Sequence, residues 1–433
     1  MNGSMEGLKI TIISTFDRSG GAATAAFRHV SLLREAGLSA RMVVRSKSTE
    51  TEFIQQVHAD WIHDRLDQFR EWGERLSYVT RAASRDQWFY FSHDQWGERI
   101  DQHPWVREAD ILHLHWFHKG FLSLDSLQHL ARLDKPMVWQ LHDMWAFTGG
   151  CHYAGGCKGY ESRCGQCPYL RSPGLHDLSH QIWSRKSTVY PTLPLSIVTC
   201  SQWLADVARS SSLLRSMPVE AIANGIDTAF YSPGDPVLAR KRLELPEDGI
   251  HLLFVAMNTR EKRKGFQELR DAIRLVVSRL NPIRLSQLRL TVLGRTDPEL
   301  ISDLPLPVDL LGFRSAPEEI RDAYRAADFF LLPSLEDNLP NTVMEAQACG
   351  CPTIAFHTGG VPEMIEHLKS GFLADHGSAS SLADGIQLAV QLDAATKSDW
   401  KQTARKTTCE QYSYEVIATQ YLSHYQRLLG SPS

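Results

Sequence analysis

Residues 329–350 read FFLLPSLEDNLPNTVMEAQACG, and this stretch decides the fold. Its first five letters form an apolar run, which predicts a buried strand of a parallel sheet. Pro340 stands where a helix favours its first residue, and Gly350 stands where a helix ends. The pattern therefore predicts a strand, an acidic loop and a short helix. Asp337 falls in the loop and Glu345 on the helix.

The two carboxylates lie near the carboxyl end of the predicted strand. Open α/β sheets bind their ligands at that end. A carboxylate accepts hydrogen bonds from two hydroxyls at once, so Asp337 and Glu345 suit a polyol such as a ribose or a hexose. The alternative is a solvated acidic loop followed by an ordinary helix.

The size and charge of the chain narrow the classes of protein. Its 433 residues are enough for two domains, and its net charge of −4 does not indicate a nucleic-acid binder. No apolar run approaches the length of a membrane span. The sequence begins Met-Asn-Gly-Ser-Met and shows no secretory signal, so a cytoplasmic protein is expected.

Strand-like and helix-like segments alternate twice along the chain, which predicts an α/β protein with two doubly wound parallel sheets. The first domain is expected at 1–217 and the second at 218–411, with a C-terminal helix in 412–433. The first set of predicted strands is 8–15, 41–44, 110–116, 136–141 and 196–201. The second set is 252–257, 288–294, 308–312, 329–333 and 353–356.

Two loops have residue types that bind phosphate. Gly20 and Gly21 follow the first strand and precede a helix, where a backbone can approach a phosphate or sugar closely. A tight turn is the equally weighted alternative. The second loop holds Arg260, Arg263 and Lys264 after the first strand of the second domain. Like the acidic pair, it follows the carboxyl end of a strand, so it is expected to face Asp337 and Glu345. Its alternative is a solvated basic loop.

Residues 47–108 are rich in aromatic and charged residues and poor in strand character. They are expected to form short amphipathic helices. Their aromatic side chains stack on a sugar face or pack the helices against the domain; packing is the more favoured role for any one of them. The residues concerned are Trp72, Trp88, Phe89, Tyr90, Phe91 and Trp96.

Four of the eight cysteines are close in sequence: Cys151, Cys157, Cys164 and Cys167. In a reducing compartment such a cluster indicates a metal site before it indicates disulfides. Four thiolates suit a structural zinc ion, with His152 as a substitute ligand. Reduced thiols that pack a loop, or disulfides, remain alternatives.

The acidic stretch resembles that of the retaining GT-B glycosyltransferases of family four, also called glycosyl transferases group 1. The family has Glu at both ends of a seven-residue gap; here Asp337 stands first, with Glu336 one residue off register. The Gly-Gly-Val-Pro-Glu segment at 359–363 follows at the family's spacing. The Arg…Lys-Gly loop at 260–265 and the linker motif at 224–227 resemble family motifs as well.

The resemblance implies a GT-B fold, with two Rossmann-like domains facing a central cleft and a last helix that crosses back onto the first domain. It also implies transfer of a hexose from a nucleoside diphosphate sugar to a saccharide or lipid-linked saccharide, with retention and without a catalytic metal or other cofactor. The implied catalytic residues are His142, Lys264, Asp337 and Glu345. The implied donor-binding residues are Gly20, Gly21, Arg260, Arg263, Lys264, Asn338, Leu339, Pro340, Asn341 and Glu345.

Two other functions fit the same fold. One is a GT-B nucleotide-sugar epimerase or phosphorolytic enzyme, and the other is an inactive module that binds a nucleotide or glycan. Residues 47–108 stand where GT-B enzymes have helices specific for the acceptor. This insertion and the intact set of site residues favour the transferase. Family analogy places such an enzyme in surface-glycan biosynthesis in the cytoplasm, with peripheral contact at the inner membrane surface.

Overall fold

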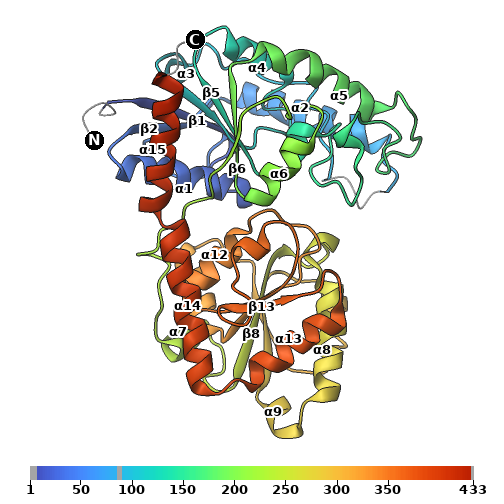
Figure 1. Cartoon of the computed structure of the whole chain (residues 1–433), viewed down its shortest axis with the longest axis vertical. Helices are drawn as coiled ribbons and strands as arrows, with labels where there is room; N and C mark the ends of the chain where they lie inside the picture. Colours follow the sequence, from blue (N-terminus) through green and yellow to red (C-terminus); the bar gives the residue numbers. More distant parts are fainter. Residues whose placement is uncertain (1–6, 85–89, 431–433) are drawn as a thin grey trace. The chain divides into compact units, whose positions relative to one another are not determined.

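The computed structural model describes residues 7–84 and 90–430 (Figure 1). The chain divides into two compact units. The first contains the residues up to Gly225 and those from Ile417 onward, and the second contains Ile226–Val416. Each unit has a parallel sheet with helices packed around it.

The sheet of the first unit has the order β3-β2-β1-β4-β5-β6-β7, and all of its described neighbours pair in parallel. Its strands are β1 (Lys9–Phe16), β2 (Ser39–Ser46), β3 (Ile54–Gln56), β4 (Ile111–Leu114), β5 (Met137–Leu141), β6 (Leu195–Thr199) and β7 (Val219–Ala221). The helices of this unit are α1 (Gly21–Glu35), α2 (Trp61–Val79), α3 (Pro104–Arg107), α4 (Leu124–Ala131), α5 (Leu178–Val189) and α6 (Gln202–Ser210).

The second unit repeats the same winding, with the sheet order β10-β9-β8-β11-β12-β13. Its strands are β8 (Ile250–Asn258), β9 (Leu288–Arg295), β10 (Val308–Gly312), β11 (Phe329–Leu332), β12 (Thr353–Phe356) and β13 (Gly371–Ala374). Its helices are α7 (Pro236–Arg242), α8 (Phe266–Arg279), α9 (Pro282–Ser286), α10 (Pro298–Ile301), α11 (Pro317–Ala326), α12 (Asn341–Ala348), α13 (Ala379–Gln391) and α14 (Ala394–Tyr412).

Both sheets reverse their strand order at one place, between β1 and β4 in the first unit and between β8 and β11 in the second. At such a switch point the loops that follow the two neighbouring strands diverge to opposite faces of the sheet. A crevice opens between them at the carboxyl ends of the strands, and ligands bind there. The topology therefore marks the loops after β1 and β4 as a candidate site of the first unit, and the loops after β8 and β11 as a candidate site of the second.

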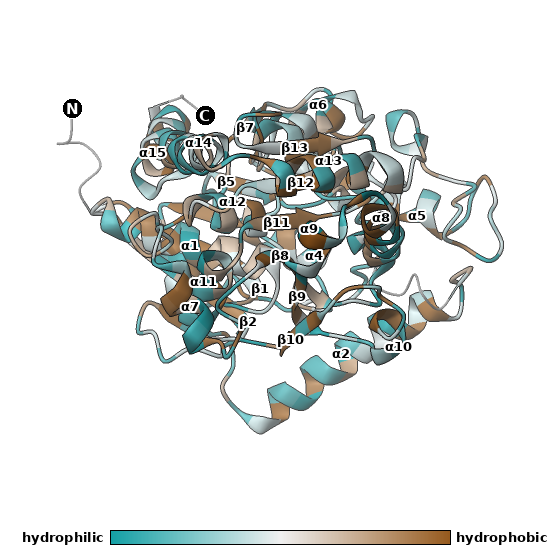
Figure 2. Ribbon diagram, turned by 90° about the horizontal axis from the view of Figure 1, so that it is seen from below, coloured by the Kyte–Doolittle hydropathy of each residue, from teal (hydrophilic) through white to brown (hydrophobic). Residues whose placement is uncertain are grey.

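The central strands are apolar because helices cover both faces of each sheet. Every residue of β4, β5 and β11 is buried. Figure 2 shows the same pattern as brown, hydrophobic ribbon along β8 and β11. Among the described residues, no helix is long and apolar enough to cross a membrane.

The last helix, α15 (Tyr414–Gly430), packs on the first unit from Ile417 onward. The Tyr421 hydroxyl donates to the side chain of Gln140, which lies on β5. His424 Nδ1 lies 2.7 Å from Glu220 Oε2, on β7. Side chains from the end of the chain thus complete the polar interior of the first sheet.

Some elements differ from the sequence-based expectation. Strands β3, β7 and β13 were not predicted, because three or four residues at a sheet edge carry too little periodicity. The predicted boundary after residue 217 precedes β7, which pairs with β6, so the first unit extends to Gly225. Trp88 and Phe89 lie outside the described residues.

Candidate active site

The loops after β8 and β11 are joined by an ion pair. Lys264 Nζ lies 2.7 Å from Asp337 Oδ2, and Arg263 Nη1 lies 3.5 Å from the same oxygen. The backbones are also bonded, since Leu335 N donates to Arg263 O at 2.8 Å. The structure therefore brings Lys264 and Arg263 of the basic loop to Asp337 of the acidic loop, at the switch point of the second sheet.

The two arginines of the basic loop also bond other residues. The Arg263 guanidinium bonds Glu261 Oε1 and donates to the backbone oxygen of Glu336 at 2.7 Å. Arg260 pairs instead with Asp297, in the loop after β9. Arg260 is thus placed on the β9 side of the loop, away from the Lys264–Asp337 pair.

Asp337 is nearly buried but ionised. Burial alone would raise the pKa of its carboxyl, but the positive charges of Lys264 and Arg263 outweigh burial, so the pKa lies below its usual value. A buried carboxylate that holds two cations in place is a preorganised electrostatic site.

Two glycines allow these loops to approach each other. A Cβ at Gly265 would lie 1.7 Å from the backbone oxygen of Pro333, at the end of β11. A Cβ at Gly359 would lie 1.7 Å from the backbone oxygen of Asp337. Both glycines also have positive φ, 68° and 53°, a conformation that side chains disfavour. The geometry around Asp337 thus depends on glycine at both positions.

Glu345 lies on α12, buried, and accepts a hydrogen bond of 2.9 Å from the Tyr324 hydroxyl. Tyr324 lies on α11, and sequence reasoning missed it because a single tyrosine on a helix gives no signal. The residues between the carboxylates form a loop that enters a helix, as predicted, but the helix begins one residue after Pro340, which was expected to be its first residue. Asn338 and Leu339 are buried, Pro340 is the N-cap, and Asn341 is the first residue of α12.

Three of the four helices that follow the switch-point strands have open N-termini; the exception is α4, after β4. Among the described residues, no side chain caps α1, α8 or α12, whose N-caps are Gly20, Gly265 and Pro340. Helix α11 shares this property, whereas α2, α4 and α6 have capping side chains. Uncapped N–H groups attract anions. Gly20 and Gly21 therefore lie at a possible anion-binding end of α1.

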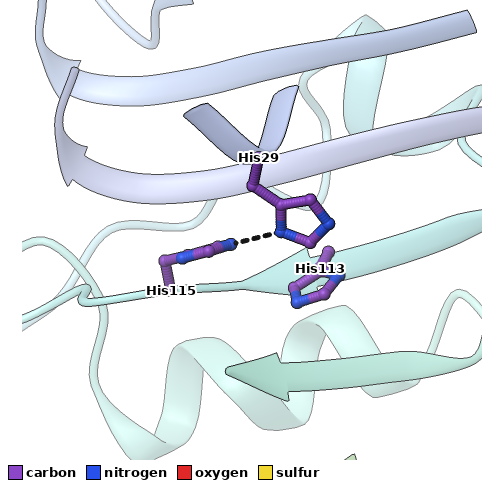
Figure 3. Close-up of side chains that lie close together, drawn as sticks. All are labelled: His29, His113 and His115. Atoms are coloured by element: carbon purple, nitrogen blue, oxygen red, sulfur yellow. Dashed lines mark hydrogen bonds between the residues drawn. The ribbon is translucent and has the colours of Figure 1, made fainter. Parts of the chain in front are cut away.

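In the first unit, His142 follows β5 and joins a chain of imidazoles. His142 Nε2 lies 2.8 Å from His115 Nδ1, and His115 Nε2 lies 3.0 Å from His29 Nδ1 (Figure 3). Beyond His29, the Tyr425 hydroxyl lies 3.3 Å from His29 Nε2 and 2.7 Å from His113 Nδ1. The chain connects the end of β5 to helix α15.

These rings are neutral at neutral pH. Burial lowers the pKa of His29 to about 3, with a smaller contribution from His142. Burial also lowers the pKa of His142 to about 4, against the opposing charge of Asp143. The pKa values of His113 and His115 lie well below the usual value, because of burial and the neighbouring imidazoles.

A neutral imidazole has one donor and one acceptor nitrogen, so the bonds among His29, His115 and His142 must run in one direction. The Tyr425 hydroxyl continues that direction to His113 when it accepts from one ring and donates to the other. His113 Nε2 is buried without a partner at one end, and His142 Nδ1 lies 3.3 Å from Cys200 Sγ at the other. An orphan N–H is rarer than an orphan acceptor, which favours donation from His113 toward Cys200. In that direction His142 Nδ1 carries the proton and Nε2 accepts from His115.

The four clustered cysteines line one small cavity of about 20 Å³ in the first unit. All eight cysteines of the chain are free thiols. Cys164 Sγ accepts a hydrogen bond of 3.0 Å from Gly149 N, and Cys157 Sγ accepts one of 3.4 Å from Gly159 N. The four thiols thus lie around one cavity, but their sulfurs would have to approach one another further to share one ion.

Among the described residues, three groups have ligand atoms within 4.8 Å of one another, and none contains a cysteine. They are His29, His113 and His115; His58, Asp60 and His63; and His118, Asp143 and His152. His152 is no ligand for the thiol cavity, because its Nδ1 lies 2.7 Å from Asp143 Oδ2 and its Nε2 lies 2.9 Å from Ser92 Oγ. These bonds fasten the cysteine loop to the end of β5.

Two doubly wound sheets, with cations and a carboxylate at the switch point of the second, have the architecture of the GT-B class of proteins. Residues 19–230 match the family described as Glycosyltransferase Family 4, and residues 249–391 match the family described as Glycosyl transferases group 1. The chain therefore belongs to the GT-B glycosyltransferases of these families.

Individual proteins are similar over different lengths. The glycosyl transferase WcaC of Escherichia coli, named for colanic acid biosynthesis, is 27% identical over 73% of this chain and 76% of its own length. The D-inositol 3-phosphate glycosyltransferase of Pseudarthrobacter chlorophenolicus is 33% identical over 46% of this chain, which spans only 50% of that enzyme.

Solved structures share the fold. Anabaena HepE in complex with UDP superposes with a TM-score of 0.62 at 16% identity, covering 97% of this chain and 100% of its own. Sucrose-phosphate synthase from Thermosynechococcus elongatus superposes with a TM-score of 0.67 at 17% identity, covering 98% and 100%. At these identities the likeness shows the fold alone.

The imidazole chain predicts a stability that falls in mild acid. A histidine whose folded pKa lies below 6.5 binds its proton more readily in the unfolded state, so stability is full above pH 6.5 and is lost toward the folded pKa. For His29 and His142 this window runs from 6.5 down to about 3 and about 4. Each imidazole contributes a slope of about 1.4 kcal/mol per pH unit in its window.

Urea unfolding followed by tryptophan fluorescence measures this slope in the first unit, because all eleven tryptophans except Trp400 belong to it. His29→Asn should lower stability at pH 7 but flatten the slope between pH 6.5 and 4. The exposed His176→Asn is the control and should leave the slope unchanged. A wild-type stability that stays level to pH 4 would show that the buried rings are not neutral.

Proposed function

We propose that this protein transfers a hexose from a nucleoside diphosphate sugar to a saccharide or lipid-linked saccharide, with retention at the anomeric carbon. The observation that carries the proposal is the group of Lys264, Arg263, Asp337 and Glu345 at the switch point between β8 and β11. It combines cations for a diphosphate with carboxylates for hydroxyl groups.

The chemistry requires both kinds of residue. When the glycosidic bond to the nucleotide breaks, positive charge grows on the sugar and negative charge on the leaving phosphate. Lys264 and Arg263 are the groups that stabilise the leaving phosphate, each oriented donor contributing about 2.7–4 kcal/mol in the transition state. The open N-terminus of α12 contributes further N–H donors.

The carboxylates and the histidine then hold the sugars. Glu345, oriented by Tyr324, accepts hydrogen bonds from the ribose hydroxyls of the nucleotide. Asp337 and Asn338 face the transferred hexose. In the first unit, His142 binds a sugar as a neutral imidazole bonded to His115, and Gly20 and Gly21 provide backbone contacts. In the second unit, Leu339, Pro340 and Asn341 provide backbone contacts to the donor, and Arg260, held by Asp297, adds positive charge on the β9 side of the basic loop. The proposed reaction uses no catalytic metal.

The comparisons support the substrate classes. HepE was solved with UDP and with UDP-glucose, and WcaC is named for the biosynthesis of a polysaccharide, colanic acid. We therefore place this enzyme in surface-glycan biosynthesis, in the cytoplasm and at the inner membrane surface. An epimerase or an inactive binding module would need the donor clamp as well, but neither needs an acceptor.

Binding of nucleotides tests the donor site. UDP, GDP or ADP at 100 times its Kd should stabilise the protein by about 2.7 kcal/mol. Lys264→Ala and Glu345→Gln should each abolish most of this shift in melting temperature. Lys262→Ala, which removes the same charge from an exposed position in the same loop, should retain it.

Each shift is measured from the variant's own ligand-free melting temperature, because Lys264→Ala leaves the buried Asp337 carboxylate with Arg263, at 3.5 Å, as its remaining cation. Adding Asp337→Asn to Lys264→Ala should recover stability without recovering binding. If no nucleoside diphosphate shifts the wild-type melting temperature at millimolar concentration, the donor-site assignment is wrong.

The anomeric configuration tests retention. The first product formed should have the same anomeric configuration as the donor sugar, because the leaving phosphate takes the acceptor proton on the same face. Proton NMR at an early time point measures the anomeric coupling before any equilibration. A product of inverted configuration would contradict retention but not the donor site.

We also propose that Cys151, Cys157, Cys164 and Cys167 hold a structural zinc ion. Their cavity has room for one small ion, and backbone N–H groups point at two of the sulfurs. Four thiolates and one Zn²⁺ leave a net negative charge, and the buried ammonium of Lys186 interacts electrostatically with Cys164 and Cys151. Binding would draw the thiols to about 2.3 Å from the ion.

Elemental analysis tests the zinc site independently of transfer. Purified protein should carry about one zinc per chain, as one four-thiolate site requires. Cys164→Ser should lower the zinc content and the melting temperature, since structural zinc is coupled to folding. Cys409→Ser, on α14, is the control and should keep the zinc. Zinc-free protein with four titratable thiols in the loop would refute the site.

Brief EDTA treatment should leave transfer active.

A further inference from the structure

Helix α2 directs its apolar side chains away from the protein. Trp61, Phe69 and Trp72 are 74%, 68% and 58% exposed, far more than aromatic residues of a surface helix usually are. Ile62, Leu66 and Leu76 are exposed as well. Figure 2 shows brown residues recurring along the ribbon of α2. At the helical repeat these six residues fall on one side of the helix, which we call the α2 apolar stripe.

The opposite side of α2 fastens it to the first unit with polar bonds. The buried Glu74 carboxylate accepts hydrogen bonds from the backbone N–H of Asp94 at 2.9 Å and of Trp96 at 3.2 Å. Tyr78 stacks on Phe91 with ring centroids 4.7 Å apart. The usual arrangement of an amphipathic helix is therefore reversed, and the orientation of α2 is fixed by specific contacts and not by burial of its stripe.

Most of the acidic residues of α2 are paired or buried. Asp67 bonds Arg70 at 3.1 Å, Glu71 bonds Arg45 at 2.8 Å and Glu74 is buried, whereas Asp64 is exposed in the first turn. Arg65 and Arg75 are exposed and stand one turn from members of the stripe. The outward face thus combines aromatic and aliphatic side chains with guanidinium groups.

We propose that the α2 apolar stripe docks the enzyme onto an anionic lipid surface. Trp and Phe favour the boundary between headgroups and acyl chains, and Arg65 and Arg75 match lipid phosphates. The helix is about 28 Å long and lies on the bilayer instead of crossing it. Six side chains of one helix are fewer than the roughly 20–30 residues that a stable protein interface needs from each partner, which favours a lipid surface over a second copy.

The docking surface deepens the proposed function, on which its biological purpose rests. A lipid-linked saccharide is held at the membrane, so an enzyme bound there meets its acceptor by diffusion in two dimensions. A soluble saccharide acceptor would require no such surface. The α2 apolar stripe therefore selects the lipid-linked class among the acceptors proposed above.

Vesicle flotation tests the docking. Wild-type protein should float with phosphatidylglycerol–phosphatidylethanolamine vesicles and bind neutral phosphatidylcholine vesicles more weakly. Trp61→Ser/Phe69→Ser/Trp72→Ser should weaken binding at least about tenfold, given the apolar area lost. Ile283→Ser/Leu310→Ser/Phe313→Ser removes three exposed apolar residues from the second unit and should bind as wild type.

Arg65→Gln/Arg75→Gln should reduce binding to the anionic vesicles and its dependence on salt. All of these side chains are exposed, so the variants should keep the wild-type melting temperature and the nucleotide-induced shift, which separates this proposal from the donor site. Wild-type protein that binds neither vesicle would overturn the docking surface. So would an equal loss in the control triple variant, or a wild-type dimer that the stripe variant converts to a monomer.

Discussion

The ion pair between Lys264 and Asp337 is the interaction on which the donor side of this enzyme depends. It joins the loop after β8 to the loop after β11, at the one place where the sheet order reverses. Burial opposes a charged Asp337, and the adjacent cations together with a hydrogen bond from Ser334 keep its pKa below the usual value. The carboxylate in turn holds the Lys264 ammonium between the two loops.

The first unit uses a different physical device. In the imidazole chain from His142 to His113, the rings are neutral and do not form ion pairs with one another. The hydrogen bonds along the chain run in one direction. Such a chain costs little in desolvation at neutral pH, because no ring is charged. It also ties the end of β5 to α15, so the end of the polypeptide determines how the residues after β5 are oriented.

The cysteine loop and α2 extend this unit outward. Asp143, beside His142, holds His152 and thereby the cysteine loop, so the loop and the imidazole chain share an anchor at the end of β5. Helix α2 is held by the buried Glu74, whose pKa burial and the neighbouring Asp94 raise to about 7. Helix α2 lies between β3 and β4, and the cysteine loop lies between β5 and β6. Both add surface to the first unit without changing the order of its sheet.

The sequence alone determined the alternation of strands and helices, the β11–loop–α12 motif and the meeting of Lys264 with Asp337. These follow from local periodicity, from Pro and Gly at helix ends, and from the rule that ligands bind at carboxyl ends of parallel strands. The tertiary structure decided the rest. It turned Arg260 to Asp297, added Tyr324 to Glu345, and joined His29, His113 and Tyr425 to His142. It also pointed the α2 apolar stripe outward. Periodicity shows that a helix has two faces, but which face is buried depends on contacts between residues far apart in the chain.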